Sequence, residues 1–234
     1  MTSLSEQTEQ DLGGPMSVLT RQKRDHVKLD RLLSELAASD MAHQSRVLGQ
    51  IYRLVFPHAF AEEAVLWPVL RRVLPDGQEL TLQVEREHQE VNELVTALES
   101  MPLEDPGRPA ILSRLVEVLR EDVRDEEDVL LPRLQAAVPR ARLTQLGVAW
   151  EVVRRVSPTR AHPIVARRPP GNSLAALPLS LIDRLRDRVD HAIQRDPGRD
   201  SPRLKTASRM LTALAHQVEE LPLMKHGEDP ATHR

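Results

Sequence analysis

Apolar residues recur at intervals of three and four along most of the chain, a spacing that predicts amphipathic helices rather than strands. Ser39 and Asp40, the PDG turn at 75–77 and the proline-rich segment 101–109 interrupt this pattern and mark the ends of the first helices. These helices are predicted at about residues 17 to 38, 41 to 73, 78 to 100 and 110 to 137. Long helices with short links are typical of an up-down-up-down four-helix bundle. The sequence therefore predicts an all-α protein.

The second predicted helix carries polar residues on its apolar side. Ile51, Val55, His58 and Glu62 fall at helical spacing, so a histidine and a carboxylate one turn apart point toward the core. Burying these groups without partners would be costly, whereas a metal ion bound between them would satisfy both. Pro57 lies beside His58 in the same helix, and we expect a kink there because proline removes a backbone donor.

The chain contains a second copy of this polar pattern. Two segments align without gaps with two later segments: 58–70 with 122–134, and 25–36 with 87–98. In the second copy His88 matches His26 and Glu126 matches Glu62, whereas Asp122 stands at the position of His58. Two copies of a helical hairpin predict near-twofold symmetry, which brings the polar positions of all four helices to one depth in the bundle.

The polar residues on the inward stripes of the predicted bundle are His26, His58, Glu62, His88, Asp122 and Glu126. Imidazole and carboxylate ligands without thiolate are typical of iron or manganese sites, with zinc as an alternative. Because one open metal site does not need so many side chains, we predict two ions bridged by carboxylates, with Glu62 and Glu126 as the bridging pair. The neighbouring acidic residues interpreted as facing solvent are Glu63, Glu87 and Glu127.

Composition narrows the other possibilities. The 234 residues include no cysteine, which excludes thiolate ligands and disulfides. The net charge is −3 with acidic and basic residues interleaved, so the basic surface expected for a nucleic-acid partner is missing. No apolar run approaches the ~20 residues needed to span a bilayer, and the N-terminus has no signal-peptide pattern. We therefore expect a cytoplasmic protein that binds neither nucleic acid nor membrane.

The ends of the chain are expected to differ from the bundle. The predicted division is residues 1–16 as a disordered leader, 17–138 as the bundle, 139–224 as a helical extension and 225–234 as a disordered tail. In the extension, a proline-rich stretch containing His162 is expected to cross the surface, and that histidine is assigned no role. Amphipathic helices at about residues 181–193 and 204–221 are expected to pack on the bundle or on a second copy of the chain, as a homo-oligomer.

On these residues the region from about 17 to 137 resembles the hemerythrin family of HHE cation-binding domains. The pattern of that family is H…HxxxE…H…HxxxE, and it is matched by His26, His58 with Glu62, His88, and Glu126. The apolar segments AVLWP and DVLLP that follow the two glutamates match it as well. The resemblance implies a four-helix bundle with a non-haem di-iron centre that handles a small molecule such as O2, NO or peroxide.

Asp122 departs from the family pattern, which has histidine at this position. An uncoordinated carboxylate would be disfavoured on a stripe otherwise made of Leu115, Leu119 and Val129, so we predict that Asp122 is a metal ligand or binds a metal-bound water. Its negative charge favours the ferric over the ferrous state, which predicts irreversible handling of peroxide or oxygen rather than reversible oxygen carriage. If the protein is an enzyme, it is expected to be an oxidoreductase of a peroxidase-like, catalase-like or NO- or O2-reacting type.

Two other interpretations remain open from the sequence. A ferritin-like carboxylate protein that oxidises iron uses Glu-x-x-His pairs, and Glu85 with His88 forms one such pair. No second pair occurs at the matching position of the repeat. The other interpretation is a helical interaction protein that has lost its metal site through Asp122.

Overall fold

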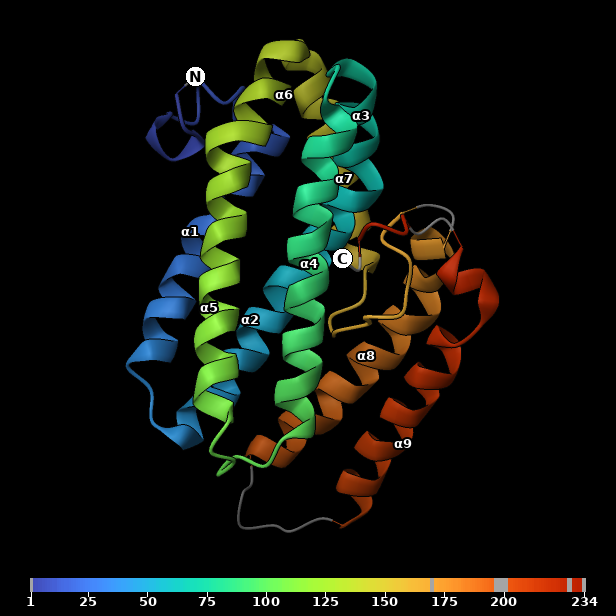
Figure 1. Ribbon diagram of the computed structural model, residues 1–234. Coiled ribbons are helices and arrows are strands. Elements are labelled where there is room, and N and C mark those ends of the chain that lie inside the picture. The colour runs from blue at the N-terminus through green and yellow to red at the C-terminus, as the bar shows by residue number, and fades with distance from the viewer. Residues whose placement is uncertain (1, 169–170, 196–201, 227–228, 233–234) are drawn as a thin grey trace.

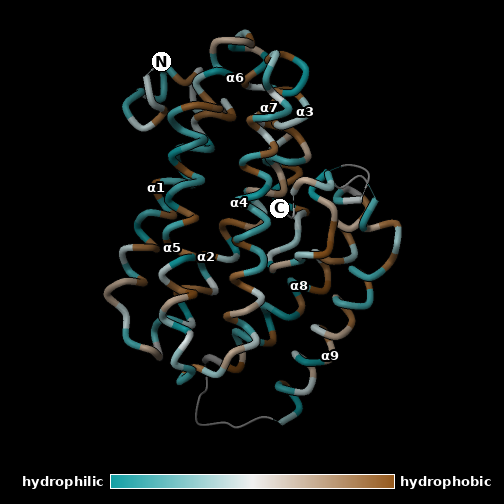
Figure 2. The backbone as a smooth tube through the Cα atoms, in the orientation of Figure 1, coloured by the Kyte–Doolittle hydropathy of each residue, from teal (hydrophilic) through white to brown (hydrophobic). Residues whose placement is uncertain are grey.

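The computed structural model describes residues 2–168, 171–195, 202–226 and 229–232, and the regular structure in these ranges is helical. The bundle consists of α1 (Val18–Ala37), α2 (Met41–Ala61), α4 (Gly77–Ser100) and α5 (Arg108–Asp125) (Figure 1). Teal and brown alternate along these helices in Figure 2, as expected when one face of a helix is buried. The predicted all-α bundle is confirmed.

The second and fourth long helices of the bundle, α2 and α5, each continue into a π-helical turn. Glu62–Leu66 joins α2 to α3 (Trp67–Val73), and Glu126–Leu130 joins α5 to α6 (Leu131–Ala137). A proline follows each turn, and its ring would clash with the carbonyl four residues earlier in a regular α-helix. The wider π-turn relieves this clash. Such turns occur frequently at functional sites.

The irregular geometry in this helix begins after His58, where we expected a kink. Helix α2 remains α-helical through Pro57 and ends at Ala61, and the change of geometry begins at Glu62. The expected irregularity beside His58 is thus found one turn later, at the glutamate of the repeated motif.

A polar layer divides the core of the bundle into two apolar clusters. Along α1, Val18 and Leu19 belong to one cluster and Leu29 to Leu36 belong to the other, with His26 between them. The remaining three helices repeat this arrangement, with their inward polar residues at the boundary of the clusters. The apolar residues on both sides fix the depth at which the polar residues meet.

The N-terminal segment packs against the bundle, which corrects the expectation of a disordered leader. Leu4 and Leu12 are fully buried in the apolar cluster that contains Trp67 and Trp150. The backbone reverses at Gly13 and Gly14, both with positive φ, a conformation that glycine adopts without steric cost. Two buried leucines are thus sufficient to anchor this otherwise polar segment. The average composition of the segment does not reveal them.

The extension begins with α7 (Arg140–Val156), which packs beside α1 and α2. Helices α8 (Gly171–Arg195) and α9 (Pro202–Glu219) pair with each other on the α4 side of the bundle (Figure 1). The proline-rich stretch between α7 and α8 does not run exposed over the surface as expected. Ser157 and His162 within it are buried, because this stretch carries the polar contacts that join α8 to α4.

The described part of the tail also has partners. Asp229 forms an ion pair with Arg168 at 3.0 Å, and the carbonyl of Ala231 accepts a hydrogen bond from Arg86. Residues 227, 228, 233 and 234 of the predicted disordered tail lie outside the described residues. Among the helices that the structure describes, none combines the length and apolar character needed to cross a bilayer.

Candidate metal centre

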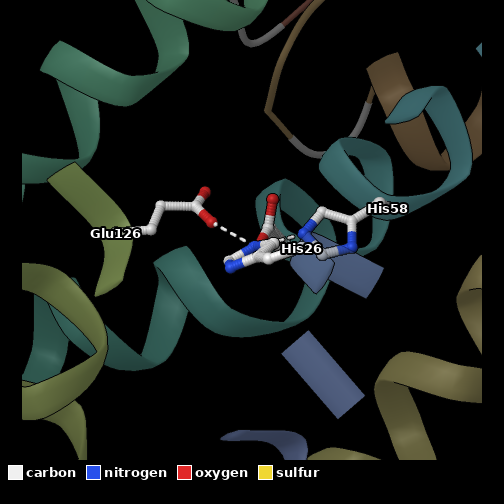
Figure 3. Close-up of side chains that lie close together, drawn as sticks. His26, His58 and Glu126 are labelled. Atoms are coloured by element: carbon white, nitrogen blue, oxygen red, sulfur yellow. Dashed lines mark ion pairs between the residues drawn. The ribbon is translucent and has the colours of Figure 1, made fainter. Parts of the chain in front are cut away.

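The structure brings together the polar residues that the sequence singled out. Two groups of ligand atoms form in the polar layer, and the atoms of each group lie within 4.8 Å of one another. The first group is His26, His58, Glu62 and Glu126, and the second is His88, Asp122 and Glu126. Figure 3 shows His26, His58 and Glu126 of the first group turned toward one another. Because Glu126 belongs to both groups, the two groups are adjacent, and each could hold a cation.

Both glutamates of the repeated motif lie between histidines of the centre. Glu62 places Oε1 at 3.1 Å from Nε2 of His58 and Oε2 at 3.7 Å from Nε2 of His88. Glu126 places Oε2 at 3.1 Å from Nε2 of His26 and Oε1 at 3.9 Å from Nε2 of His88. Each carboxylate thus directs its two oxygens to different histidines.

Asp122 also points into the centre. Its Oδ1 lies 3.5 Å from Nε2 of His88, and its side chain is 13% exposed. Asp122 therefore occupies the place of the fourth histidine of the family pattern, on the same side of α5 as Glu126.

Among the described residues, the atoms that face the centre lack hydrogen-bond partners, and this observation tests whether a cation fits. The buried side-chain atoms without a partner include Nε2 of all three histidines, both oxygens of Glu62, both oxygens of Glu126 and Oδ1 of Asp122. Leaving one such polar atom buried and unsatisfied costs about 1–3 kcal/mol, and more when the group is charged. Metal coordination would satisfy the whole set, so the residues present fit a cation site.

Carboxylates on the outer side of the centre orient the three histidines. Each histidine donates a hydrogen bond from Nδ1 to one carboxylate. His58 donates to Asp25 at 3.2 Å. His88 donates to Glu63 and His26 donates to Glu127, both at 2.9 Å. In each ring, Nε2 is left facing the centre. Carboxylates in this position fix the orientation of a ligating imidazole and raise its basicity.

The interpretation of Glu63 and Glu127 as solvent-facing residues is wrong. Their exposed fractions are 1% and 9%. Both residues lie in π-helical turns, where successive side chains are separated by a smaller rotation than in an α-helix. Two consecutive glutamates can therefore both face inward. The repeat carried a signal for this, because the Glu-Glu pair is present in both copies.

Glu87 shows the consequence of the departure at position 122. The repeat places Glu87 where the first copy has Asp25, whose partner is His58. The equivalent partner of Glu87 would be a histidine at 122, but Asp122 cannot donate to it, and Oε2 of Glu87 has no hydrogen-bond partner among the described residues. Burial, with Asp122 and Asp125 nearby, raises the pKa of Glu87 to about 8.

The centre carries an excess of negative charge, which appears in the pKa values of its residues. Burial lowers the pKa of His26, but the Glu126 and Glu127 carboxylates outweigh this and raise it to about 9. Burial, together with Glu62 and Asp122, raises the pKa of Glu126 to about 8. Protons thus offset the repulsion between carboxylates, and cations would offset it more strongly.

Both tryptophans of the chain lie against candidate ligands. Trp67 stacks beside His88, with ring centroids 6.4 Å apart. Trp150 of α7 meets His58 edge to face at 5.3 Å. These large side chains shield the centre from solvent. Because they contact candidate ligands, we expect their fluorescence to respond to a bound transition metal.

The pair suggested by the ferritin-like interpretation is not formed at the centre. Glu85 is fully buried and hydrogen-bonds Arg71 and Arg168 instead. Its negative charge is therefore already compensated. The geometry supports the hemerythrin-like interpretation over this alternative.

We expect Glu63→Gln to weaken metal binding by roughly 10- to 100-fold, the usual effect of losing a carboxylate that orients a ligating histidine. The glutamine is nearly isosteric but uncharged, so His88 would keep its place and lose basicity. Metal affinity is measured by chelator competition, with tryptophan fluorescence as the signal. Glu79→Gln, on the exposed side of α4, is the control and should bind as wild type does. Equal affinities for both variants would show that Glu63 does not support His88.

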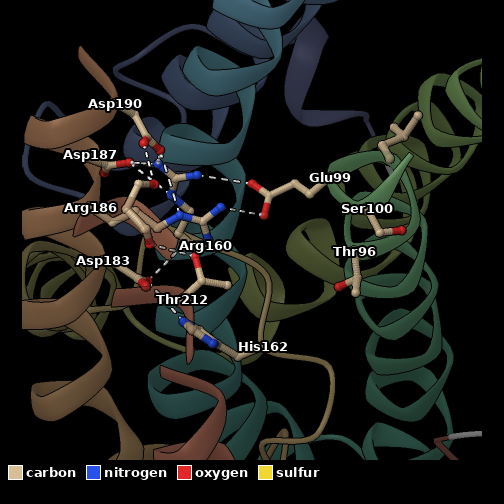
Figure 4. Close-up of polar contacts among 12 residues, drawn as sticks. Thr96, Glu99, Ser100, Arg160, His162, Asp183, Arg186, Asp187, Asp190 and Thr212 are labelled. Atoms are coloured by element: carbon tan, nitrogen blue, oxygen red, sulfur yellow. Dashed lines mark hydrogen bonds and ion pairs between the residues drawn. The ribbon is translucent and has the colours of Figure 1, made fainter. Parts of the chain in front are cut away.

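The extension also contains a buried histidine, His162, which lies beside the bundle among polar partners. His162 contacts Glu219 of α9 through Nδ1 at 2.8 Å and Asp183 of α8 through Nε2 at 3.0 Å, and its backbone N–H donates to Asn92 of α4. Figure 4 shows this residue below the ion pairs of Arg160 with Glu99 and the acidic residues of α8. The sequence assigned His162 no role because its carboxylate partners lie far along the chain.

We expect the buried contacts of His162 to make the free energy of unfolding decrease at alkaline pH. Burial lowers its pKa, but Asp183 and Glu219 outweigh this and raise it to about 9. Because the folded-state pKa exceeds the unfolded value, the stabilisation is complete below about pH 6.5 and is lost as the pH rises through 9, by roughly 3 kcal/mol at most. Urea unfolding at pH 7 and pH 10 should show a smaller decrease for His162→Gln than for wild type. His216→Gln, an exposed control on α9, should behave as wild type; equal decreases in all three proteins would refute the prediction.

Comparison with known proteins agrees with the geometry of the centre. The model of the hemerythrin HHE cation-binding domain matches residues 17–134, which include every residue of the two ligand groups. An uncharacterized hemerythrin-like protein of Schizosaccharomyces pombe is 27% identical over 169 residues, covering 71% of this chain and 83% of that protein. A DNA nickase of a Nostoc species is 31% identical over 117 residues, covering 48% of this chain and 32% of the nickase. No solved structure matches the chain. The chain belongs to the family of hemerythrin HHE cation-binding domains.

Proposed function

We propose that the chain binds two iron ions in the polar layer and reacts there with a small oxidant or gas: O2, NO or peroxide. The observation that carries this proposal is the convergence of buried, unpartnered ligand atoms in two groups that share Glu126. A donor set of imidazole and carboxylate suits iron, and manganese or zinc are the alternatives. Bound iron would supply the change between ferrous and ferric states.

The space beside the centre limits the size of the molecule that reacts. A cavity of about 30 Å3 lies against His58, His88 and Asp122, and its other walls include Leu54 and Phe56. A single water needs roughly 10–15 Å3 measured in this way. The cavity therefore suits a diatomic molecule or a peroxide, and its apolar walls limit access of bulk water.

Asp122 supports irreversible chemistry over reversible oxygen carriage. Replacing a neutral imidazole by a carboxylate adds one negative charge beside the ions and stabilises the ferric state. Glu62, Glu126 and Asp122 together supply three carboxylates to the centre. We therefore propose an oxidoreductase of a peroxidase-like, catalase-like or NO- or O2-reacting type.

The remaining predictions concern nucleic acid, cellular location and assembly. The DNA nickase match covers a minor part of that protein, and the present chain has a net charge of −3, so we propose no nucleic-acid activity. A cytoplasmic location, the absence of a membrane partner and a homo-oligomer formed through the C-terminal helices stay predictions.

Stopped-flow absorption of the reduced, iron-loaded protein mixed with H2O2, O2 or NO tests the proposed function. One of these reagents should oxidise or bind the centre faster than it reacts with free ferrous iron, with a change in the near-ultraviolet and visible absorption. Manganese- or zinc-loaded protein serves as the control. No reaction with any of the three reagents, in protein with a full complement of iron, would contradict the proposal.

A further inference from the structure

A second, larger cavity lies on the outer side of the metal centre. This groove runs between α1 and α5 and has a volume of about 440 Å3, within the ~300–1,000 Å3 typical of small-molecule sites. It shares His26, Leu29, Leu119 and Val123 with the small cavity beside the centre. These shared side chains place the α1–α5 groove next to the small cavity where the oxidant would react.

Three arginines of the groove have no partner among the described residues. Arg31 of α1 and Arg120 and Arg124 of α5 line it and are exposed, and no hydrogen bond or ion pair joins any of the three to another described residue. By contrast, Arg114, also on α5 but outside the groove, pairs with Glu90 and Glu117. The groove therefore holds positive charge that the fold itself does not use.

The other ionic groups of the groove leave this charge uncompensated. Lys23 donates to the carbonyls of Ser5 and Gln7, and Glu127 is hydrogen-bonded to His26. Asp30 is then the single acidic residue of the lining that has no such contact, against three arginines. Arg120 and Arg124 are also one helical turn apart, and like charges at this spacing destabilise a helix. An anionic ligand would relieve this repulsion.

The rest of the lining is apolar. Val27, Leu29 and Leu33 of α1 face Leu119 and Val123 of α5 across the groove. Leu29, Leu33 and Leu119 are buried core residues, and Val27 is 44% exposed. A ligand that fits this lining needs an apolar part as well as a negative charge.

We propose that the α1–α5 groove binds a small amphipathic organic anion. Its carboxylate or phosphate group would contact the three arginines, and its apolar part would pack on the leucine and valine side chains between the helices. Arginine suits this role because its planar guanidinium group forms paired hydrogen bonds to such anions. The arginines and apolar side chains that would contact the anion lie outside the two ligand groups, although His26 also lines the groove, so the site does not depend on the proposed chemistry of the centre.

Isothermal titration calorimetry of the full-length, metal-loaded protein with octanoate tests the proposal. Octanoate and octyl phosphate represent the two anionic groups, and either should bind with one site per chain. Octan-1-ol lacks the charge, octylammonium reverses it, and inorganic phosphate lacks the apolar part. Each of these three should bind roughly tenfold more weakly or not at all, because it loses one of the two kinds of contact. Absence of binding by both anions, or equal binding of octan-1-ol or inorganic phosphate, would overturn the proposal.

Variants locate the site. Arg120→Gln with Arg124→Gln should raise the Kd for the bound anion roughly tenfold or more. The control, Arg72→Gln with Arg188→Gln, removes the same charge from exposed arginines outside the groove and should leave the Kd unchanged. Val27→Asp should weaken binding, whereas Val27→Asn, of the same shape but neutral, should retain most of it. Equal affinities in the two double variants, or in the two Val27 variants, would overturn the assignment to this groove.

Discussion

Replacing Glu126 by alanine is expected to reduce the metal content from about two ions per chain to one or none. Glu126 belongs to both ligand groups, and its two oxygens face different histidines. Its removal therefore takes one ligand from each group and leaves only His88 and Asp122 in the second. No other single substitution in the centre should have a larger effect. Metal content is measured by elemental analysis after removal of loosely bound ions.

Two further variants guard against a general effect on folding. Glu126→Gln keeps the size of the side chain but not its charge, and it should also lose metal while retaining the helical circular dichroism of wild type. Asp128→Ala removes an exposed carboxylate from the same π-helical turn and should bind metal normally. Full metal content in both Glu126 variants would show that this residue is not a bridging ligand.

Asp122→His is expected to raise the reduction potential of the centre and slow its oxidation by air. The change removes one negative charge. At an effective dielectric constant of 20, the interaction energy between two unit charges 4 Å apart is about 4 kcal/mol. That energy corresponds to roughly 0.1–0.2 V for one electron. The potential is measured by spectroelectrochemical titration, with Asp122→Ala expected instead to lose or loosen one ion. Identical potentials and metal contents in wild type and both variants would show that Asp122 has no part in the centre.

Glu87 makes this prediction more specific. A histidine at 122 would have Glu87 as the partner of its Nδ1, as His58 has Asp25. Asp122→His should therefore bind metal more tightly than Asp122→His combined with Glu87→Gln, by roughly 10- to 100-fold. In the presence of Asp122, the change Glu87→Gln should have little effect on affinity. Equal affinities of the single and double variants would show that Glu87 does not support residue 122.

The repeat is the reason that the fold and the ligand groups could be predicted from the sequence. Helical spacing placed His58 and Glu62 on one inward stripe, and the second copy placed His88 at the position equivalent to His26 and Glu126 at the position equivalent to Glu62. The structure brings these residues together at the boundary of two apolar clusters. Local periodicity and internal symmetry were sufficient because each helix of the bundle obeys the same spacing rule.

The outer residues of the centre could not be predicted in the same way. Glu63 and Glu127 face inward because of π-helical turns, which the period of a regular α-helix does not describe. Trp150 reaches His58 from α7, beyond the repeat. Contacts between segments far apart in sequence, such as His162 with Asp183 and Glu219, depend on tertiary packing and leave no periodic signal.

The iron content of the purified full-length chain, read together with its absorption spectrum, tests the central claim most directly. The arrangement of two ligand groups sharing Glu126 predicts about two iron ions per chain, with oxo-to-iron absorption in the near ultraviolet and visible for the oxidised protein. A protein that remains free of metal after exposure to ferrous iron, and whose tryptophan fluorescence does not respond to the metal, would contradict the account.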